Sequence, residues 1–251
     1  MDNLEDVTRL PEDFGGRVRL FPLPELVVFP HAMQPLHLFE PRYCEMLADS
    51  LASDELIAMA TLETPTLAGG VVGIGGGVAP TAPPIADLLC VGRIVSHSEL
   101  EDDRHNILLV GVRRARLLRE LETSRPYRMA DVEILDDIYP PAGASSRRSL
   151  KGRLLEAFGK TVPPSENVQK NLYELMAGQM RLGPITDIVS FMLPFSTEQK
   201  LQLLGTHNVD DRAERIIQFL AEGSFDLELI SAEVQKPDKP QSTFPPPFSV
   251  N

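Results

Sequence analysis

The chain has 251 residues, of which 43% are hydrophobic, and it carries a formal net charge of −12 with an isoelectric point near 4.9. This length exceeds the roughly 100 to 150 residues of a typical domain, so two compact parts are expected. The acidic balance argues against a nucleic-acid partner, because phosphate binding requires clustered Lys and Arg. No window reaches the roughly 18 to 20 apolar residues of a membrane helix, and the acidic N-terminus does not resemble a secretion signal. We expect no membrane association and a cytoplasmic location.

The first 16 residues are polar, acidic and without period, so a flexible leader is expected. Residues Leu20–Tyr43 then hold two short strand signals. The first is the apolar run Val27–Phe29, which Pro30 closes, and the second is Leu36–Phe39 with its intervening histidine facing the other way. Two strands joined this closely predict the rim of a groove.

A helix is expected from Pro41 to about Ser53. Proline suits the first helical turn, where no N–H partner is needed, and an apolar stripe follows at helical spacing in Met46, Leu47 and Leu51. Strand patterns surround this helix on both sides, over residues 17–21, 56–62, 88–96, 106–118 and 127–135. Gly111 interrupts the fourth of these and predicts a bend there. Many strands with one helix favour a small closed or half-closed β-barrel.

Between residues 63 and 87 the strand pattern is replaced by glycines and prolines. A phosphate-binding loop is poorly supported, because no Lys-Ser or Lys-Thr follows the glycines. A flexible insertion is favoured, and a mobile flap over the barrel is the alternative.

Pro140–Gly143 marks a predicted domain boundary, after which the period becomes helical. Helices are expected over residues 149–162, from Ser165 to Gly183, over 185–193, over 196–204 and after Asn208. Residues 196–199 read Ser-Thr-Glu-Gln, a capping box. The predicted organisation is a β domain over 17–139, a helical bundle over 145–222 and a Pro-rich flexible tail over 223–251. The tail could instead be a short linear peptide that docks elsewhere.

Several motifs resemble the N-terminal, substrate-binding domain of Lon proteases. They are Phe21-Pro22-Leu23, Val27-Val28-Phe29-Pro30 and Leu36-His37-Leu38-Phe39-Glu40-Pro41-Arg42-Tyr43, followed by Leu193-Pro194-Phe195-Ser196 and Asp211-Arg212. The resemblance covers about residues 17–222 and implies an α+β fold, in which a PUA-like barrel or half-barrel with one helix precedes a helical bundle. The long 63–87 loop departs from the family pattern.

Catalytic constellations are missing from the sequence. No GxxxxGK[ST] is present, which excludes a P-loop ATPase, and Ser149 and Lys151 would point in different directions on a helix. His37 with Cys44 lacks the flanking features of a nucleophile pair. The five histidines and two cysteines show no metal-ligand spacing. We expect no enzyme activity, no cofactor and no metal, and a stand-alone member without the ATPase and protease modules of full-length Lon.

One basic cluster, Arg113 to Arg116 with Arg119 after it, lies in a strand-like run. We interpret it as a solvated strand edge, with counter-charges from Glu120, Glu122 and the acidic run 101–103.

The candidate peptide-binding residues all come from the Leu20–Tyr43 stretch. Exposed apolar contact is expected of Phe29, Pro30, Met33 and Pro35. Phe39, Glu40, Arg42 and Tyr43 complete the set. For Glu40 and Arg42 a structural role is favoured over ligand contact: the positive end of the helix dipole favours Glu40, and Arg42 or Tyr43 packs the helix onto the barrel.

The resemblance implies a non-catalytic module that binds unfolded or tagged polypeptides, alone or as an adaptor to a protease or ATPase partner. The alternative is a PUA-like nucleic-acid module, which the net charge and the lack of an aromatic platform disfavour. Hydrolysis by unidentified residues is a third possibility.

Overall fold

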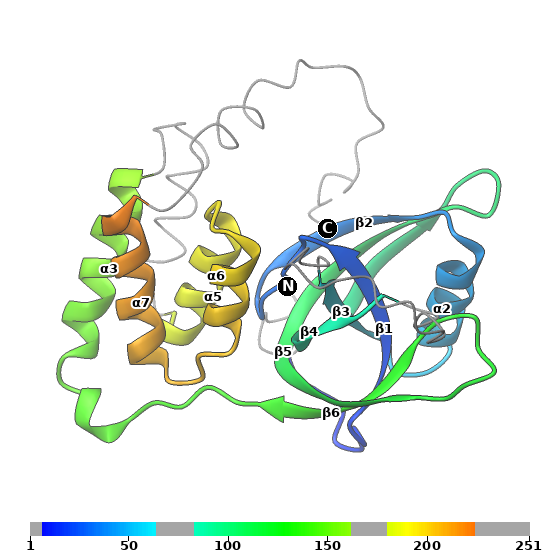
Figure 1. Cartoon of the computed structure of the whole chain (residues 1–251), viewed down its shortest axis with the longest axis horizontal. Helices are drawn as coiled ribbons and strands as arrows, with labels where there is room; N and C mark the ends of the chain where they lie inside the picture. Colours follow the sequence, from blue (N-terminus) through cyan, green and yellow to red (C-terminus); the bar gives the residue numbers. More distant parts are fainter. Residues whose placement is uncertain (1–6, 64–82, 162–179, 224–251) are drawn as a thin grey trace, which may run out of the picture.

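The computed structural model describes residues 7–63, 83–161 and 180–223. Six strands and five α-helices fall within them (Figure 1). The strands are β1 (Arg17–Pro24), β2 (Met33–Leu38), β3 (Leu56–Leu62), β4 (Ile85–Glu99), β5 (His105–Leu121) and β6 (Met129–Leu135). The helices are α2 (Pro41–Leu51), α3 (Arg147–Thr161), α5 (Leu182–Met192), α6 (Thr197–Leu204) and α7 (Val209–Glu222), and a short 3₁₀ turn spans Pro141–Gly143. The architecture is therefore mixed α/β.

The six strands form one mixed sheet that closes on itself. Its order is β2-β5-β4-β3-β1-β6, and a further pairing of β5 with β6 completes a ring of five strands. Only β1 and β3 run parallel; the other pairs are antiparallel. The first half of β5 pairs with β2 and its second half with β6. Strand β2 therefore lies outside the ring, as an edge strand of the sheet. The closed sheet agrees with the expected barrel.

Helix α2 confirms the predicted helix to within two residues. Pro41 occupies its first turn, and its apolar stripe packs onto the sheet through Tyr43, Met46 and Leu47, all buried. The Tyr43 ring meets Phe21 of β1 edge-on at 4.5 Å between centroids. Since edge-to-face aromatic pairs add to the energy of burial, this contact fixes the helix on the barrel.

The remaining helices share one hydrophobic core. Side chains from α3, α5, α6 and α7 are buried together, and α3 lies beside α7 (Figure 1). The predicted capping box is confirmed, since Ser196 accepts from the Gln199 N–H while the Gln199 side chain accepts from the Ser196 N–H. The predicted cap at Asn208 is also confirmed, with its side chain accepting from the first-turn N–H groups of α7.

The expectation of a strand at Val27–Phe29 is wrong. These residues form no ladder, and Val27 and Phe29 are buried among the helices rather than in the barrel. A turn at Pro30–His31 follows, in which His31 has φ +64°. The segment passes so close to β5 that a Cβ on Gly111 would overlap the Phe29 carbonyl. Glycine at position 111 therefore allows the backbone around Phe29 to pass close to β5. The β4–β5 register is also irregular at this position.

Other boundaries differ from the sequence prediction. Strand β4 begins at Ile85, inside the expected loop, and residues 64–82 of that loop lie outside the described residues. So do most of the helix expected from Ser165 and the tail 224–251. Helix α5 starts at Leu182, so Gly183 begins a helix rather than ending one. Of the expected leader, residues 7–16 are described, and Arg93 and Arg113 donate to backbone carbonyls within it.

Candidate functional site

The exposed side chains of β2 form the first candidate surface. Met33, Pro35 and His37 face outward, while Leu36 and Leu38 alternate toward the barrel. Phe39, which was expected within this strand, follows its last residue and is 64% exposed; Met33 is 47% exposed. The rings of His37 and Phe39 stack at 6.0 Å. We call Met33, Pro35, His37 and Phe39 the β2 surface.

The free edge of β2 is protected against pairing with another strand. Pro35 has no N–H to offer, and its carbonyl accepts a 2.8 Å hydrogen bond from the Gln34 side chain. Proline at an edge strand commonly blocks strand addition. The β2 surface can therefore contact a partner through side chains more readily than through the backbone.

Glu40 and Arg42, two of the predicted binding residues, satisfy each other. The Arg42 guanidinium donates to Glu40 Oε2 from Nε at 2.9 Å and from Nη2 at 2.6 Å, and it lies 4.8 Å from the centre of the Tyr43 ring. Glu40 makes no side-chain cap to α2. Tyr43 is buried, with 7% exposure, so it supports the helix instead of facing a partner.

Phe29 and Pro30 were expected to be exposed, and both are buried. Phe29 has no exposed surface, because it packs into the core of the helices. Pro30 lines a cavity between the sheet and the helices. Of the predicted set, only Met33, Pro35 and Phe39 therefore lie on the β2 surface, and only Pro30 lines the cavity.

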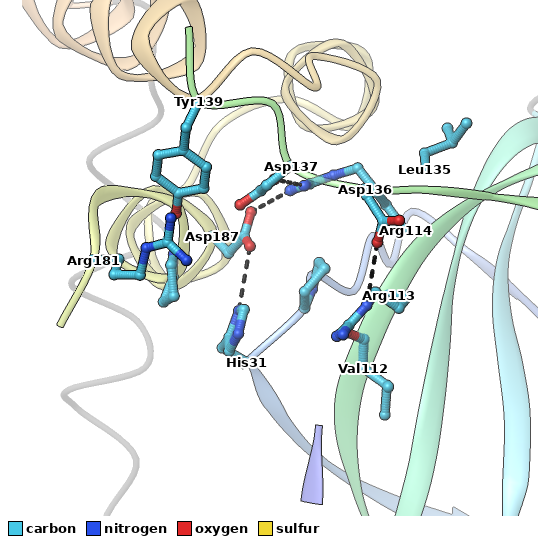
Figure 2. A pocket seen from close by; sticks show the side chains of 12 residues that line it. His31, Val112, Arg113, Arg114, Leu135, Asp136, Asp137, Tyr139, Arg181 and Asp187 are labelled. Atoms are coloured by element: carbon cyan, nitrogen blue, oxygen red, sulfur yellow. Dashed lines mark hydrogen bonds and ion pairs between the residues drawn. The ribbon is translucent and has the colours of Figure 1, made fainter. Parts of the chain in front are cut away.

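The second candidate site, which we call the junction cavity, has a volume of about 350 Å³. Figure 2 shows its walls, which come from the Pro30–His31 turn, β5, the segment after β6 and α5. Its charged lining consists of three arginines and three aspartates, Arg113, Arg114, Arg181, Asp136, Asp137 and Asp187. Apolar surface is contributed by Pro30, Val112, Leu135 and Pro184.

A buried ion cluster forms one wall of the cavity. Arg114 donates to both Asp137 and Asp187 (Figure 2), and its side chain is 2% exposed. Arg212 of α7, fully buried, lies 2.9 Å from Asp137 and 3.4 Å from Asp187. Burial alone would raise the pKa of Asp187, but Arg212, Arg114 and His31 outweigh it and hold that pKa below its usual range. Sheet and helices are therefore joined by a paired charge cluster.

His31 reaches the same cluster from the turn after Phe29. Its Nδ1 lies 3.3 Å from Asp187 Oδ2, and its backbone N–H donates to the Gly111 carbonyl at 2.8 Å. The positive φ at His31 is uncommon for a residue other than glycine, and it aims the ring across the junction (Figure 2).

Arg181 is held differently from the other arginines of the cavity. Its guanidinium carbon lies 4.1 Å from the centre of the Tyr139 ring, whose hydroxyl accepts a 3.1 Å hydrogen bond from Gly183 N–H. Within the described ranges, no carboxylate lies within ion-pair distance of Arg181. A Cβ at Gly183 would overlap Asp137 and Tyr139, so glycine allows α5 to approach this closely.

The interpretation of the basic cluster as a solvated edge is wrong for Arg114. Arg113, Arg116 and Arg119 do lie at the surface, but their acidic partners are Asp136, Glu133 and Asp131 rather than the residues expected. Arg114 is 2% exposed although its neighbour Ala115 is buried as well, so strand alternation alone does not predict its burial. Its charge is paired with Asp137 and with Asp187, which lies 73 residues away.

Neither a metal site nor a thiol nucleophile is seen in the described part of the chain. It holds no group of three or more His, Cys, Asp or Glu side chains suited to a metal. His37 contacts Asn106 and Cys44 contacts the Asp103 carbonyl, so the two do not form a pair. Cys90 is buried, which raises its pKa. None of the helices described is long and apolar enough to cross a membrane.

The family model of the ATP-dependent protease La (LON) substrate-binding domain matches residues 17–222. The chain belongs to this family. The match confirms the resemblance carried by the Leu20–Tyr43 motifs, and it spans both the sheet and the helices.

Lon proteases are among the similar curated proteins. That of Koribacter versatilis is 26% identical over 234 residues, which are 89% of this chain and 26% of the relative. That of Dictyoglomus thermophilum is 24% identical over 91% of this chain and 28% of the relative. The chain thus spans about a quarter of the length of the Lon proteases that it matches.

Solved Lon N-terminal domains share the fold. A Lon N-terminal domain protein from Xanthomonas campestris aligns with a TM-score of 0.56 at 19% identity, covering 81% of this chain and 98% of its own. The N-terminal domain of the Mycobacterium avium complex Lon protease aligns with a TM-score of 0.61 at 13% identity, covering 82% and 98%.

Proposed function

We propose that this protein is a non-catalytic polypeptide-recognition module, which binds unfolded or tagged proteins at the β2 surface. The observation that carries the proposal is an exposed apolar face, with Phe39 64% and Met33 47% exposed, in a chain of the Lon substrate-binding domain family. Exposed apolar groups gathered on one strand are typical of interaction sites.

The chemistry of the β2 surface suits sequence-tolerant binding. Phe39 offers a large, stiff apolar contact, and the neighbouring charges of Glu40 and Arg42 are paired with each other. Because Pro35 and Gln34 block strand addition, recognition would depend on apolar side chains of the partner and not on a fixed backbone register. An unfolded chain offers such side chains, whereas a folded one buries them.

The test measures binding of a reduced, fluorescently labelled unfolded protein by anisotropy. A double variant, Met33→Ser with Phe39→Ser, should bind about tenfold more weakly, as expected for loss of central apolar anchors. Leu118→Ser is the matched control, since Leu118 is 61% exposed at the opposite end of β5. Equal binding by the double variant and the control would contradict the proposal.

Two further outcomes would replace this function with another. Retention of single-stranded RNA by the wild-type protein would favour the nucleic-acid alternative. Cleavage of labelled casein that persists after removal of contaminating proteases would favour an enzyme.

We also propose the finer organisation predicted from the sequence. The closed ring of strands supports a PUA-like barrel over residues 17–139, and the separate core of α3, α5, α6 and α7 supports a helical bundle over 145–222. Membership of the substrate-binding domain family supports the further proposal of an adaptor role toward a protease or ATPase partner. The two unpaired cysteines are compatible with action in the cytoplasm.

A further inference from the structure

Arginines are concentrated at the junction cavity of an acidic protein. Counting Arg212, which contacts its aspartates, four arginines face three aspartates there, although the whole chain has a formal net charge of −12. Asp137 and Asp187 each contact both Arg114 and Arg212, and Asp136 lies at the solvent-exposed side beside Arg113. Among the arginines that line the cavity, Arg181 alone has no ion-pair partner within the described residues.

The position of Arg181 suits recognition of a carboxylate. Stacking on Tyr139 orders the guanidinium plane, and the Gly183–Tyr139 hydrogen bond orders the ring beneath it. A guanidinium held in this way can present two parallel N–H donors to a planar anion. Arg181 also precedes α5, whose positive dipole end favours negative charge nearby.

The rest of the cavity lining is partly apolar. The Arg114 guanidinium in its wall is committed to Asp137 and Asp187. Beside Arg181, the lining includes Pro30, Leu135 and Pro184. Pockets that combine apolar walls with a few convergent polar groups are typical ligand sites. The volume of the cavity, about 350 Å³, lies within the range of small-ligand pockets.

We propose that the junction cavity binds the C-terminal residue of a polypeptide, with its carboxylate on Arg181 and an apolar side chain against the prolines. This rests on the proposed function, which brings polypeptide chains to the molecule, and extends it to a second site. A free small carboxylic acid shares the same chemistry, and the test separates the two sources.

The experiment uses labelled eight-residue peptides ending in leucine, prepared with a free carboxylate or as the carboxamide. Wild-type protein should bind the carboxylate form about tenfold more tightly, as expected for a charge-assisted hydrogen-bond pair. Arg181→Gln should abolish this difference. Arg148→Gln, which removes an exposed charge outside the cavity, should retain it. Equal binding of the two peptide forms, or a preference that survives Arg181→Gln, would overturn the proposal.

N-acetyl-leucine, measured by calorimetry, forms the second arm. Binding much weaker than that of the peptide supports a polypeptide C-terminus, whereas equal affinity would assign the cavity to free acids and overturn the polypeptide part. Because the β2 surface is tested with Met33 and Phe39 variants, loss of the carboxylate preference with intact binding of unfolded protein would reject this inference alone.

Discussion

Two neighbouring parts of one segment have opposite environments. Phe29 is completely buried between sheet and helices, whereas Phe39, ten residues later, is 64% exposed at the end of β2. Both belong to apolar runs that look alike in sequence. The difference shows that one part of the segment joins the two halves of the molecule, and the other is available to a partner.

Exchanging each phenylalanine for alanine is the most direct way to break this comparison. Phe29→Ala should lower the free energy of unfolding by about 3–5 kcal/mol, because it leaves a cavity in the helical core. Phe39→Ala should change it by less than about 0.5 kcal/mol, since its side chain is mostly solvated. Urea denaturation of both variants checks this, and similar losses would contradict the assignment.

The charge cluster at the junction should also be essential for stability. Asp187→Ala leaves Arg114 and Arg212 buried with only Asp137 between them, and should cost about 3 kcal/mol, the lower end for breaking a buried pair. Asp136→Ala is the control, because the Asp136 side chain is 80% exposed, and should cost less than about 0.5 kcal/mol. Equal losses in denaturant melts would show that the buried cluster does not join the halves.

The close approach of α5 to the segment after β6 gives a smaller effect. Gly183→Ala would force a methyl group against Asp137 and Tyr139, and should destabilise by about 1–3 kcal/mol. Gly152→Ala on α3 meets open space, and should stabilise by about 0.5–1 kcal/mol through helix propensity. Thermal unfolding of the pair measures the contrast, and a neutral Gly183→Ala would refute the tight packing.

Acid should weaken the junction through Asp187. The folded-state pKa of Asp187 lies below the unfolded value of about 3.9, so its contribution is present above that value and is lost as pH falls through the folded pKa. Stability should therefore decrease as the pH falls below about 4, the ordinary Asp value, and Asp187→Ala should remove part of that slope. An unchanged slope in the variant would show that other carboxylates dominate acid unfolding.

Features set by local contacts were predictable from the sequence. The α2 helix, the capping box at Ser196 and the cap at Asn208 depend on neighbours within four residues, and each was found as expected. Apolar runs and strand alternation likewise predicted all six strands; the predicted ends match for β3 and differ for the others.

Features set by distant contacts were not. An apolar run such as Val27–Phe29 predicts that its side chains are buried, but it does not predict which hydrophobic core they join. Arg114 appears in sequence beside exposed arginines, and its acidic partners are 23 and 73 residues away. Arg181 stacks on Tyr139 across 42 positions of the sequence, which no local pattern encodes.

The separation of the junction partners along the chain has a consequence for synthesis. All six strands precede residue 136, yet the arginine inside the fifth strand is neutralised fully only when α5 and α7 have formed. While a ribosome is still making those helices, Arg114 has only the first of its two acidic partners, Asp137, and the core around Phe29 is missing. The strand region therefore emerges from the ribosome before its contacts are complete. The apolar segment around Phe29 and the charge of Arg114 find their remaining partners only when the helices have been made.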